Sequence, residues 1–266
     1  MYEGLPEDEI EAIMDTLLSN YVSVSQAMWR FPELDVVRAV NVARPVLEIG
    51  CGSGTFTRLA MGHVEKAIDI NPKAVERARR QAGIYESVET QDARDLITAP
   101  ESYSTVFANC VLEHIPNLPG VLSSCQSALK PGGQLVATVP LPEMNNHLLF
   151  RGRRYAAWRQ RGLVHHNLWP VEQWESALTD AGFTSVSSVP YLSPRLCRIW
   201  DLLDGPLMVG WRRYRLGAVL RYGRLVLPKQ WRSGLRRRLA PRLVRVVRER
   251  PAGGGAACAA LIVATK

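Results

Sequence analysis

Apolar residues recur in short runs along the chain, and most runs are followed by a stretch with helical spacing. Strands are predicted at 46–49, 66–70, 87–90, 104–110, 134–139, 183–189 and 256–265. Strands that alternate with helices in this way are typical of an α/β domain with a largely parallel sheet. In such an open sheet the ligand site is expected at the carboxyl ends of the strands.

Apolar residues near the start of the chain also follow helical spacing and predict one or two helices over residues 5–30. The first 18 residues are acidic and lack both a basic segment and a continuous apolar stretch, so they are not expected to act as a signal peptide. The longest nearly apolar run, 256–265, is shorter than the ~20 residues of a membrane-spanning helix. We therefore expect a cytoplasmic protein.

Residues 45–54, PVLEIGCGSG, join the first predicted strand to a helix that begins near Thr55. Gly50, Gly52 and Gly54 remove the Cβ at alternate positions, so the backbone can take positive φ and a ligand can lie against the N–H groups of the helix start. The dinucleotide fingerprint needs a small residue where Thr55 stands, which weakens NAD or FAD as the ligand. The stretch predicts a nucleotide-like ligand of another kind.

Five ordered segments resemble the motifs of the class I S-adenosylmethionine (SAM) methyltransferases. Glu48 with Gly50, Gly52 and Gly54 resembles their first motif, and the others are AIDINPKAVERAR (67–79), Gln91-Asp92-Ala93, FANCVLEHI (107–115) and ALKPGGQLVATVP (128–140). The resemblance covers roughly residues 30–190 and the last strand. It implies a Rossmann-like, seven-stranded, mostly parallel sheet with helices on both faces and an antiparallel last strand, and it implies SAM as the cofactor.

Three parts are predicted along the chain. Residues 1–44 form an N-terminal helical cap, residues 45–190 together with 256–266 form the SAM-binding core, and residues 191–255 form a basic helical insertion before the last strand. Prolines and interleaved apolar and arginine residues predict two or three short amphipathic helices in the insertion. From 143 to 167 the pattern dissolves into a long polar and aromatic connection, which holds substrate in the resembling family.

Two carboxylates are the main candidates for cofactor binding. Asp69 ends the second predicted strand, where a carboxylate can accept from both ribose hydroxyls. The alternative is that Asp69 caps the next helix, a role that Asn71 can fill itself. The resemblance implies that Asp92 binds the adenine amino group, and Arg30 can pair with the cofactor's carboxylate. The full candidate set is Glu48, Gly50, Cys51, Gly52, Gly54, Asp69, Ile70, Asp92, Ala93, Asn109 and Arg30.

Histidines are the candidate catalytic residues, because an imidazole titrates near neutrality and can deprotonate a hydroxyl. His114 lies in a V-L-E-H stretch that resembles small-molecule methyltransferases, and His165 and His166 lie in the connection after the fifth strand. Structural roles, with hydrogen bonds to the backbone, stay open for these histidines. Some quinone O-methyltransferases have a metal-binding carboxylate where Cys110 stands, so no metal site is predicted.

The fourth strand does not end in D/N-P-P-[YF], the motif of enzymes that methylate exocyclic amines of nucleic-acid bases. The resemblance therefore implies methyl transfer to a small-molecule, lipid-linked or glycan acceptor, with oxygen as the expected atom. Transfer to nitrogen or carbon, non-methylating SAM chemistry, and a methyltransferase-like module that only binds nucleic acid or membrane stay open as alternatives. Proximity and orientation can supply much of the catalysis of methyl transfer, so an evident base is not required.

The formal net charge is +8, and residues 195–250 hold sixteen basic residues against three acidic ones. The basic character therefore belongs to this one segment. Aromatic residues such as Trp200, Trp211 and Tyr222 accompany the arginines, a combination that suits a membrane interface. We expect the segment to cover the acceptor pocket and to bind an anionic membrane surface, which would place the protein peripherally at the inner membrane face. A soluble lid is the alternative, and nucleic acid is not the expected partner.

The five cysteines are scattered and include no C-x-x-C pair. This argues against a disulfide framework or a zinc knuckle and predicts reduced thiols. Cys51 is expected to be a small filler in the glycine loop and not a nucleophile.

Overall fold

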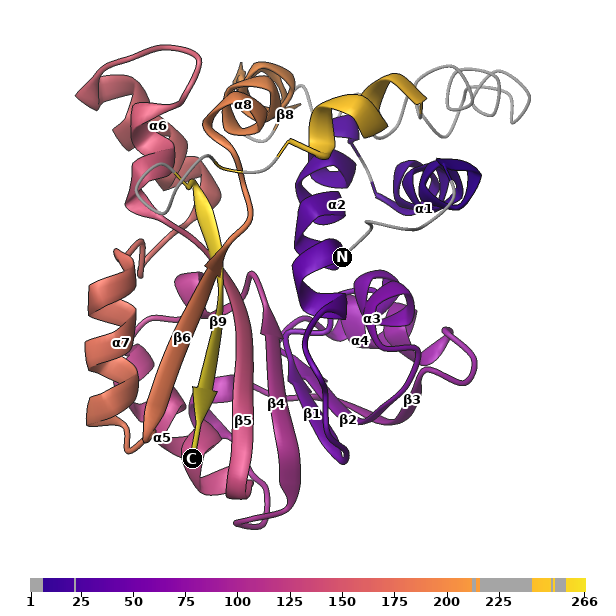
Figure 1. The fold of residues 1–266 in the computed structure, drawn as a ribbon, viewed down its shortest axis with the longest axis vertical. Coiled ribbons are helices and arrows are strands. Elements are labelled where there is room, and N and C mark those ends of the chain that lie inside the picture. Colours follow the sequence, from indigo (N-terminus) through magenta and orange to yellow (C-terminus); the bar gives the residue numbers. More distant parts are fainter. Residues whose placement is uncertain (1–6, 22, 212–213, 216–240, 250, 252–256) are drawn as a thin grey trace. The chain divides into compact units, whose positions relative to one another are not determined.

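The computed structural model of the 266-residue chain describes residues 7–21, 23–211, 214–215, 241–249, 251 and 257–266 (Figure 1). The chain divides into two compact units, each assembled from segments far apart in the sequence. The first comprises Val36–Pro142, His165–Tyr191 and Ala259–Lys266, and the second comprises Met1–Asp35, Glu143–Val164 and Leu192–Cys258. The predicted three-part division of the chain stays a prediction.

The first unit is built on a seven-stranded sheet with the order β3-β2-β1-β4-β5-β9-β6. Its strands are β1 (Val46–Ile49), β2 (Val64–Asp69), β3 (Tyr85–Thr90), β4 (Tyr103–Asn109), β5 (Leu129–Pro140), β6 (Ser185–Pro190) and β9 (Ala259–Thr265). All pairings among β1 to β5 are parallel, and β9 pairs antiparallel with β5 and β6. The predicted Rossmann-like, mostly parallel sheet with an antiparallel last strand is confirmed.

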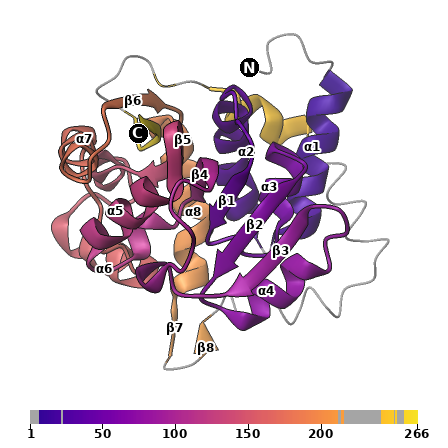
Figure 2. The same cartoon turned by 90° about the horizontal axis from the view of Figure 1, so that it is seen from below.

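Helices cover both faces of this sheet (Figures 1 and 2). They are α3 (Thr55–Ala60), α4 (Pro72–Arg79), α5 (Leu118–Ala128) and α7 (Val171–Asp180), with the short 3-10 turns η1 (Ala93–Asp95) and η2 (Leu112–His114). Successive residues of β2 point to the two faces. Ile68 lies in the large core with α5 and α7, whereas Ala67 lies in a smaller core with Val75 and Ala78 of α4. This alternation is expected of a strand that is buried on both sides.

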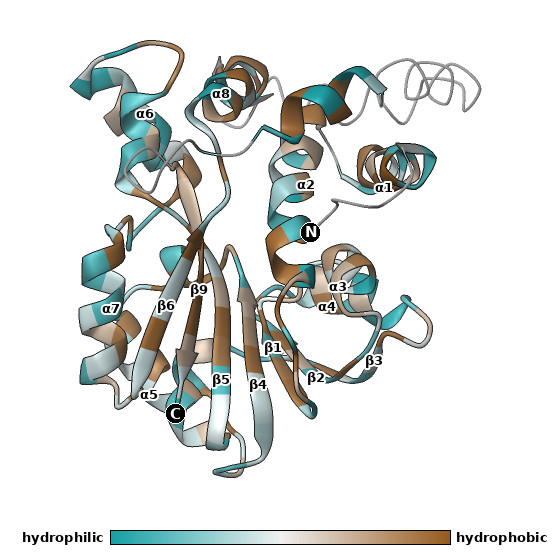
Figure 3. Cartoon of the chain, in the orientation of Figure 1, coloured by the Kyte–Doolittle hydropathy of each residue, from teal (hydrophilic) through white to brown (hydrophobic). Residues whose placement is uncertain are grey.

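The register of the sheet brings the predicted site segments together. Ile49 of β1 pairs with Ile68 of β2 and with Ala108 of β4, and Asp69 of β2 pairs with Thr90 of β3. Because these strands are parallel, their carboxyl ends meet at one edge of the sheet. Strands β1 and β9 are largely apolar, whereas β3 and β6 alternate apolar with polar residues (Figure 3). The polar groups of a site at this edge come from the strand ends and from the segments that follow them.

The second unit is mainly helical. Its helices are α1 (Glu7–Asn20), α2 (Val24–Arg38), α6 (Arg153–Leu163), α8 (Pro194–Met208) and a helix at 241–247, with the 3-10 turn η3 (Pro142–Asn146). Of these, α2 and η3 cross the unit boundary. Strands β7 (Gly210–Trp211) and β8 (Tyr214–Arg215) pair antiparallel. Trp29 of α2 packs against Trp200 of α8 with ring centroids 5.0 Å apart. The guanidinium carbon of Arg159 in α6 lies 4.7 Å from the same Trp200 ring. These three helices therefore share one core.

The helices predicted over residues 5–30 are α1 and α2. The amphipathic pattern of the insertion is confirmed around 241–248, where Val244 and Val247 are buried and Arg242, Arg245 and Arg248 are exposed. The predicted helical residues between 216 and 240 lie outside the described residues. In the part of the chain that the structure describes, no helix combines the length and the apolar character needed to cross a membrane.

The segment 143–167 differs from the expectation. The sequence predicts an irregular connection there, whereas residues 153–163 form α6. The inward-facing Arg159 of this helix is fully buried, where it pairs with Asp201 and Asp204 of α8. Because a charged residue occupies a core position, the helical periodicity of apolar residues is broken and the pattern fails to indicate a helix.

Candidate functional site

The glycine loop follows β1 and leads into α3. Gly50, Gly52 and Gly54 have φ of 73°, 57° and 74°, in the left-handed region that glycine adopts at little cost. The loop is tied to β2, because the N–H groups of Gly50 and Cys51 donate to the carbonyl oxygen of Ile68 at 2.8 and 3.2 Å. The backbone itself therefore requires the G-x-G-x-G spacing.

Gly50 and Gly62 offer a matched test of this requirement. Both have positive φ, of 73° and 74°, but a Cβ added at Gly50 would overlap Cγ2 of Val111, whereas one at Gly62 would meet no atom within 4 Å. Gly50→Ala is expected to lower the free energy of unfolding by about 1–3 kcal/mol more than Gly62→Ala, because both variants share the left-handed strain and only the overlap differs. Urea unfolding measures this difference, and equal losses would contradict the overlap.

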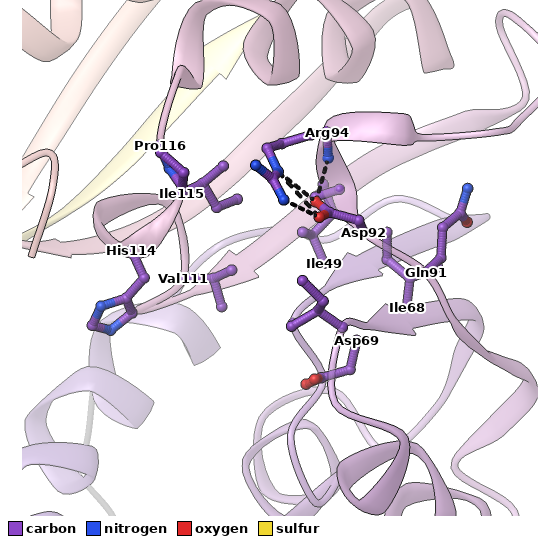
Figure 4. Close-up of a pocket in the computed structure, with 13 residues that line it drawn as sticks. Ile49, Ile68, Asp69, Gln91, Asp92, Arg94, Val111, His114, Ile115 and Pro116 are labelled. Atoms are coloured by element: carbon purple, nitrogen blue, oxygen red, sulfur yellow. Dashed lines mark hydrogen bonds and ion pairs between the residues drawn. The ribbon is translucent and has the colours of Figure 1, made fainter. Parts of the chain in front are cut away.

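A pocket of about 270 Å³ lies beside the glycine loop, at the carboxyl ends of the parallel strands (Figure 4). Five of the predicted cofactor-binding residues line it, namely Gly50, Asp69, Ile70, Asp92 and Ala93. Apolar side chains such as Ile68, Val111 and Ile115 form much of its wall. An apolar pocket with a few polar groups is typical of a site for a small organic ligand.

Asp69 lies between the pocket and the glycine loop. Its Oδ2 accepts a hydrogen bond from the N–H of Gly52 at 2.8 Å, and its Oδ1 accepts from the N–H of Asn71 at 2.8 Å. The side chain of Asn71 caps α4 by accepting from the N–H of Lys73. Asp69 is therefore not needed as the cap of this helix. Each carboxylate oxygen of Asp69 has a further lone pair that can accept a ligand hydroxyl.

Asp92 lines another part of the pocket and is held by Arg94. Oδ1 of Asp92 accepts from the backbone N–H of Arg94 at 2.9 Å and from its Nε at 3.1 Å, while Oδ2 accepts from Nε at 3.1 Å and from Nη2 at 2.6 Å (Figure 4). These hydrogen bonds lower the pKa of the Asp92 carboxyl below its usual range. Sequence reasoning did not single out Arg94, although it is only two residues from Asp92.

Glu48 lies under the glycine loop and does not line this pocket. It is buried, with Oε1 accepting from the hydroxyl of Thr57 at 2.6 Å and Oε2 accepting from the hydroxyl of Tyr85 at 2.9 Å. Burial, helped by the Asp69 charge and opposed by the two hydroxyls, raises the pKa of Glu48 from 4.5 to about 7. Tyr85 also packs on the loop, since a Cβ added at Gly54 would lie 2.9 Å from its Cε2. Glu48 is therefore placed to support the loop.

Five other predicted cofactor residues also lie outside this pocket lining, namely Gly52, Gly54, Cys51, Asn109 and Arg30. Cys51 is buried, and burial together with two nearby carboxylates raises the pKa of its thiol, which favours the filler role. Asn109 accepts a hydrogen bond from Thr138 at 2.9 Å. Arg30 belongs to the helical unit and pairs with the buried Glu33 at 2.5 Å. The cofactor roles of Asn109 and Arg30 stay predictions.

Two of the three candidate histidines lie together. His114 lines the pocket, and its ring centroid is 5.1 Å from that of His165. His166 has an exposed side chain and contributes its backbone N–H, which donates to the carbonyl oxygen of Glu113 at 2.7 Å. The geometry therefore favours His114 and His165 over His166 as groups that act on a ligand.

Asn167 fastens the histidine loop to η2. Its side-chain amide donates to the carbonyl oxygens of Leu112 and Ile115 at 2.8 and 2.7 Å. Its backbone N–H donates to the carbonyl oxygen of Glu113 at 3.0 Å. Asn167 is buried, so these hydrogen bonds are shielded from water. Sequence reasoning missed Asn167, because its partners are more than fifty positions away.

The ligand atoms of Glu113, His114 and His165 all lie within 4.8 Å of one another, a donor set that could hold a metal ion. One carboxylate and two imidazoles suit a transition metal better than Mg²⁺. The spacing of residues along the chain points to Cys110 at such a site and does not indicate that His165 joins Glu113 and His114. The absence of a metal from the reaction stays a prediction.

A comparison with protein families identifies the kind of domain that carries this site. A family model described as a methyltransferase domain matches residues 30–188, more than half of the chain. The chain belongs to this methyltransferase family. The prediction of a class I SAM-dependent methyltransferase is confirmed, and with it SAM as the cofactor of the family.

Curated relatives match a shorter region. The chain is similar to a ubiquinone biosynthesis O-methyltransferase of Xanthomonas euvesicatoria, with 35% identity over 96 residues that cover 34% of this chain and 40% of the relative. A protein of the same name from Xanthomonas campestris is 35% identical over 111 residues, which cover 38% and 46%. The chain thus spans less than half the length of the curated relatives it matches.

Solved structures match most of the chain. A SAM-dependent methyltransferase from Thermotoga maritima superposes with a TM-score of 0.58 and 18% identity over 89% of each chain. Phosphoethanolamine N-methyltransferase 2 of Haemonchus contortus, solved with S-adenosylhomocysteine, gives a TM-score of 0.54 and 16% identity over 95% of this chain and 60% of that one. Such low identities show the fold alone.

Proposed function

We propose that the chain transfers the methyl group of SAM to an oxygen atom of a small-molecule acceptor. The observation that carries this proposal is the pocket beside the glycine loop, where Asp69, Asp92 and His114 lie among apolar walls at the carboxyl ends of the parallel strands. Oxygen as the acceptor atom is supported by the names of the curated relatives, which are O-methyltransferases.

The residues of the pocket fit the cofactor group by group. Asp69 can accept from ribose hydroxyls, and Asp92 can accept from an adenine amino group. A Cβ added at Gly52 would meet no protein atom within 4 Å, so the loop leaves room for a ligand against its backbone. When bound, SAM supplies an electrophilic methyl group on a sulfonium.

The chain's own residues would then orient the acceptor and take up its proton. A neutral imidazole nitrogen of His114 or His165 can accept the proton of an acceptor hydroxyl, and general-base help of this kind is worth roughly 10²–10⁴ in rate. Nε2 of His114 lies 3.7 Å from Oε1 of Glu113, a carboxylate that can stabilise the imidazolium. Asn167 positions the histidine loop on η2 through its three hydrogen bonds.

Binding of S-adenosylhomocysteine, measured by titration calorimetry, tests the cofactor assignment. Asp69→Ala is expected to weaken binding by ~1–3 kcal/mol, because hydrogen bonds to the ligand are lost together with the hydrogen bond to Gly52. Asp180→Ala, which removes an exposed carboxylate at the end of α7, is the matched control and is expected to leave binding unchanged. Binding of NADH without binding of S-adenosylhomocysteine would overturn the proposed function.

More narrowly, we propose that the acceptor is a lipid-linked or other anionic molecule at the inner face of a membrane. This is supported by the described part of the basic segment, in which Arg242, Arg245 and Arg248 are exposed beside the buried Val244 and Val247. Exposed arginines near an anionic surface contribute ~1 kcal/mol each at best, so attachment should fall as salt rises. Cosedimentation with anionic and neutral vesicles at low and high salt tests this, and equal pelleting with both kinds of vesicle would exclude it.

A further inference from the structure

Both oxygens of the Asp92 carboxylate are hydrogen-bonded to one neighbour, Arg94. Three N–H groups of Arg94 donate to the carboxylate: the backbone N–H to Oδ1, an N–H of Nη2 to Oδ2, and the single N–H of Nε shared between the two oxygens (Figure 4). An ionised carboxylate offers about four lone-pair positions in total. A ligand amino group that approaches Asp92 must therefore share the carboxylate and its negative charge with Arg94.

The pair is exposed enough to be displaced. The side chains of Arg94 and Asp92 are 47% and 22% exposed, so water screens their attraction. Both residues line the pocket. A pair of this kind contributes little to the stability of the fold, but it lies where a ligand must compete with it.

Arg94 also supplies hydrogen-bond donors of its own. A guanidinium has five N–H groups, and the ion pair with Asp92 engages only Nε and Nη2, so N–H groups on Nη1 and Nη2 are left for a ligand. Gln91, the amide next to Asp92, has its Nε2 directed to the carbonyl oxygen of Asp95 at 2.9 Å. Among the described residues that line this pocket, Arg94 is the only arginine or lysine. It is therefore the main cationic donor available to a base.

We propose that Arg94 sets the base selectivity of the pocket by competing with the amino group of adenine for Asp92. This rests on the proposed function, because it assumes that the purine of the cofactor lies beside Asp92. A 6-amino purine must share the carboxylate with Arg94, which weakens its hydrogen bond, whereas a 6-oxo purine can accept from the guanidinium while the ion pair stays in place. The wild-type chain therefore discriminates weakly between the two bases, and removal of Arg94 sharpens the preference for adenine.

Titration calorimetry with S-adenosylhomocysteine and with its 6-oxo analogue, S-inosylhomocysteine, tests this. Arg94→Ala is expected to tighten binding of the adenosine ligand about threefold and to weaken binding of the inosine ligand about threefold, since an exposed ion pair is worth a few-fold in affinity. The ratio of the two dissociation constants then shifts about tenfold. Arg94→Lys, which keeps the charge but loses the planar fork, is expected to give a smaller shift in the same direction.

Arg80→Ala is the matched control, because Arg80 is an exposed arginine of the same unit that pairs with Glu76 on α4 and does not line the pocket. It is expected to leave both dissociation constants unchanged. A parallel change for the two ligands in Arg94→Ala and Arg94→Lys would show a purely structural role and overturn the selectivity proposal alone. If the wild-type chain bound neither ligand, the proposed function would fail first, and the inference would fail with it.

Discussion

Arg159→Ala is expected to lower the free energy of unfolding of the helical unit by about 3–5 kcal/mol, the usual cost of removing one partner from a buried ion pair. Arg159 is fully buried, with Nε 2.6 Å from Oδ1 of the equally buried Asp201 and Nη2 3.0 Å from Oδ2 of Asp204. Its guanidinium also lies against the Trp200 ring. The alanine variant would leave the charge of Asp201 without its cation in a core from which water is excluded.

Urea unfolding followed by tryptophan fluorescence measures this loss. Arg161→Ala is the matched control, because Arg161 lies on the same helix but is exposed. Arg159→Met combined with Asp201→Asn is expected to recover part of the stability, since the asparagine oxygen is neutral and can still accept from the N–H of Leu149 and the hydroxyl of Tyr155. If Arg159→Ala cost no more than Arg161→Ala, the ion pair would not hold this unit together.

The glycine loop and its edge of the sheet could be predicted because their requirements are local. A strand, three glycines at alternate positions and a helix start follow one another within ten residues, and the structure gives all three glycines positive φ. The position of Asp69 follows from topology, since parallel neighbours end at the same edge. Its hydrogen bond to the N–H of Gly52 confirms that this carboxylate meets the loop.

The parts that could not be predicted depend on partners far away in the sequence. Glu48 belongs to the recognised motif, but its hydroxyl partner Tyr85 is 37 residues away. No pattern along the chain indicates that Asn167 would fasten His165 beside His114, because that depends on how two loops meet. The helix α6 is missed for a related reason, since the sequence pattern treats Arg159 as a solvated residue whereas Asp201 and Asp204 make its burial favourable.

The stability of the wild-type chain is expected to fall, relative to Glu48→Gln, as pH rises from about 5 to 8. Glu48 is buried against the hydroxyls of Thr57 and Tyr85, with Asp69 and the Cys51 thiol as its titratable neighbours besides Tyr85. Burial raises its pKa in the folded chain to about 7, against 4.5 in the unfolded chain. Between these values the folded chain binds more protons than the unfolded chain, so the free energy of unfolding decreases with rising pH.

The contribution of Glu48 is fully present below pH 4.5 and is lost as pH rises through about 7. The gap between the two pKa values corresponds to on the order of 3 kcal/mol. Glutamine can still accept from one hydroxyl but carries no titrating proton, so the difference between wild type and Glu48→Gln isolates this one group. Urea unfolding at pH 5, 6, 7 and 8 measures the difference, with Glu172→Gln on the exposed face of α7 as the control. Parallel pH profiles for wild type and Glu48→Gln would mean that Glu48 is already ionised beneath the glycine loop at pH 5, and that Thr57 and Tyr85 outweigh its burial.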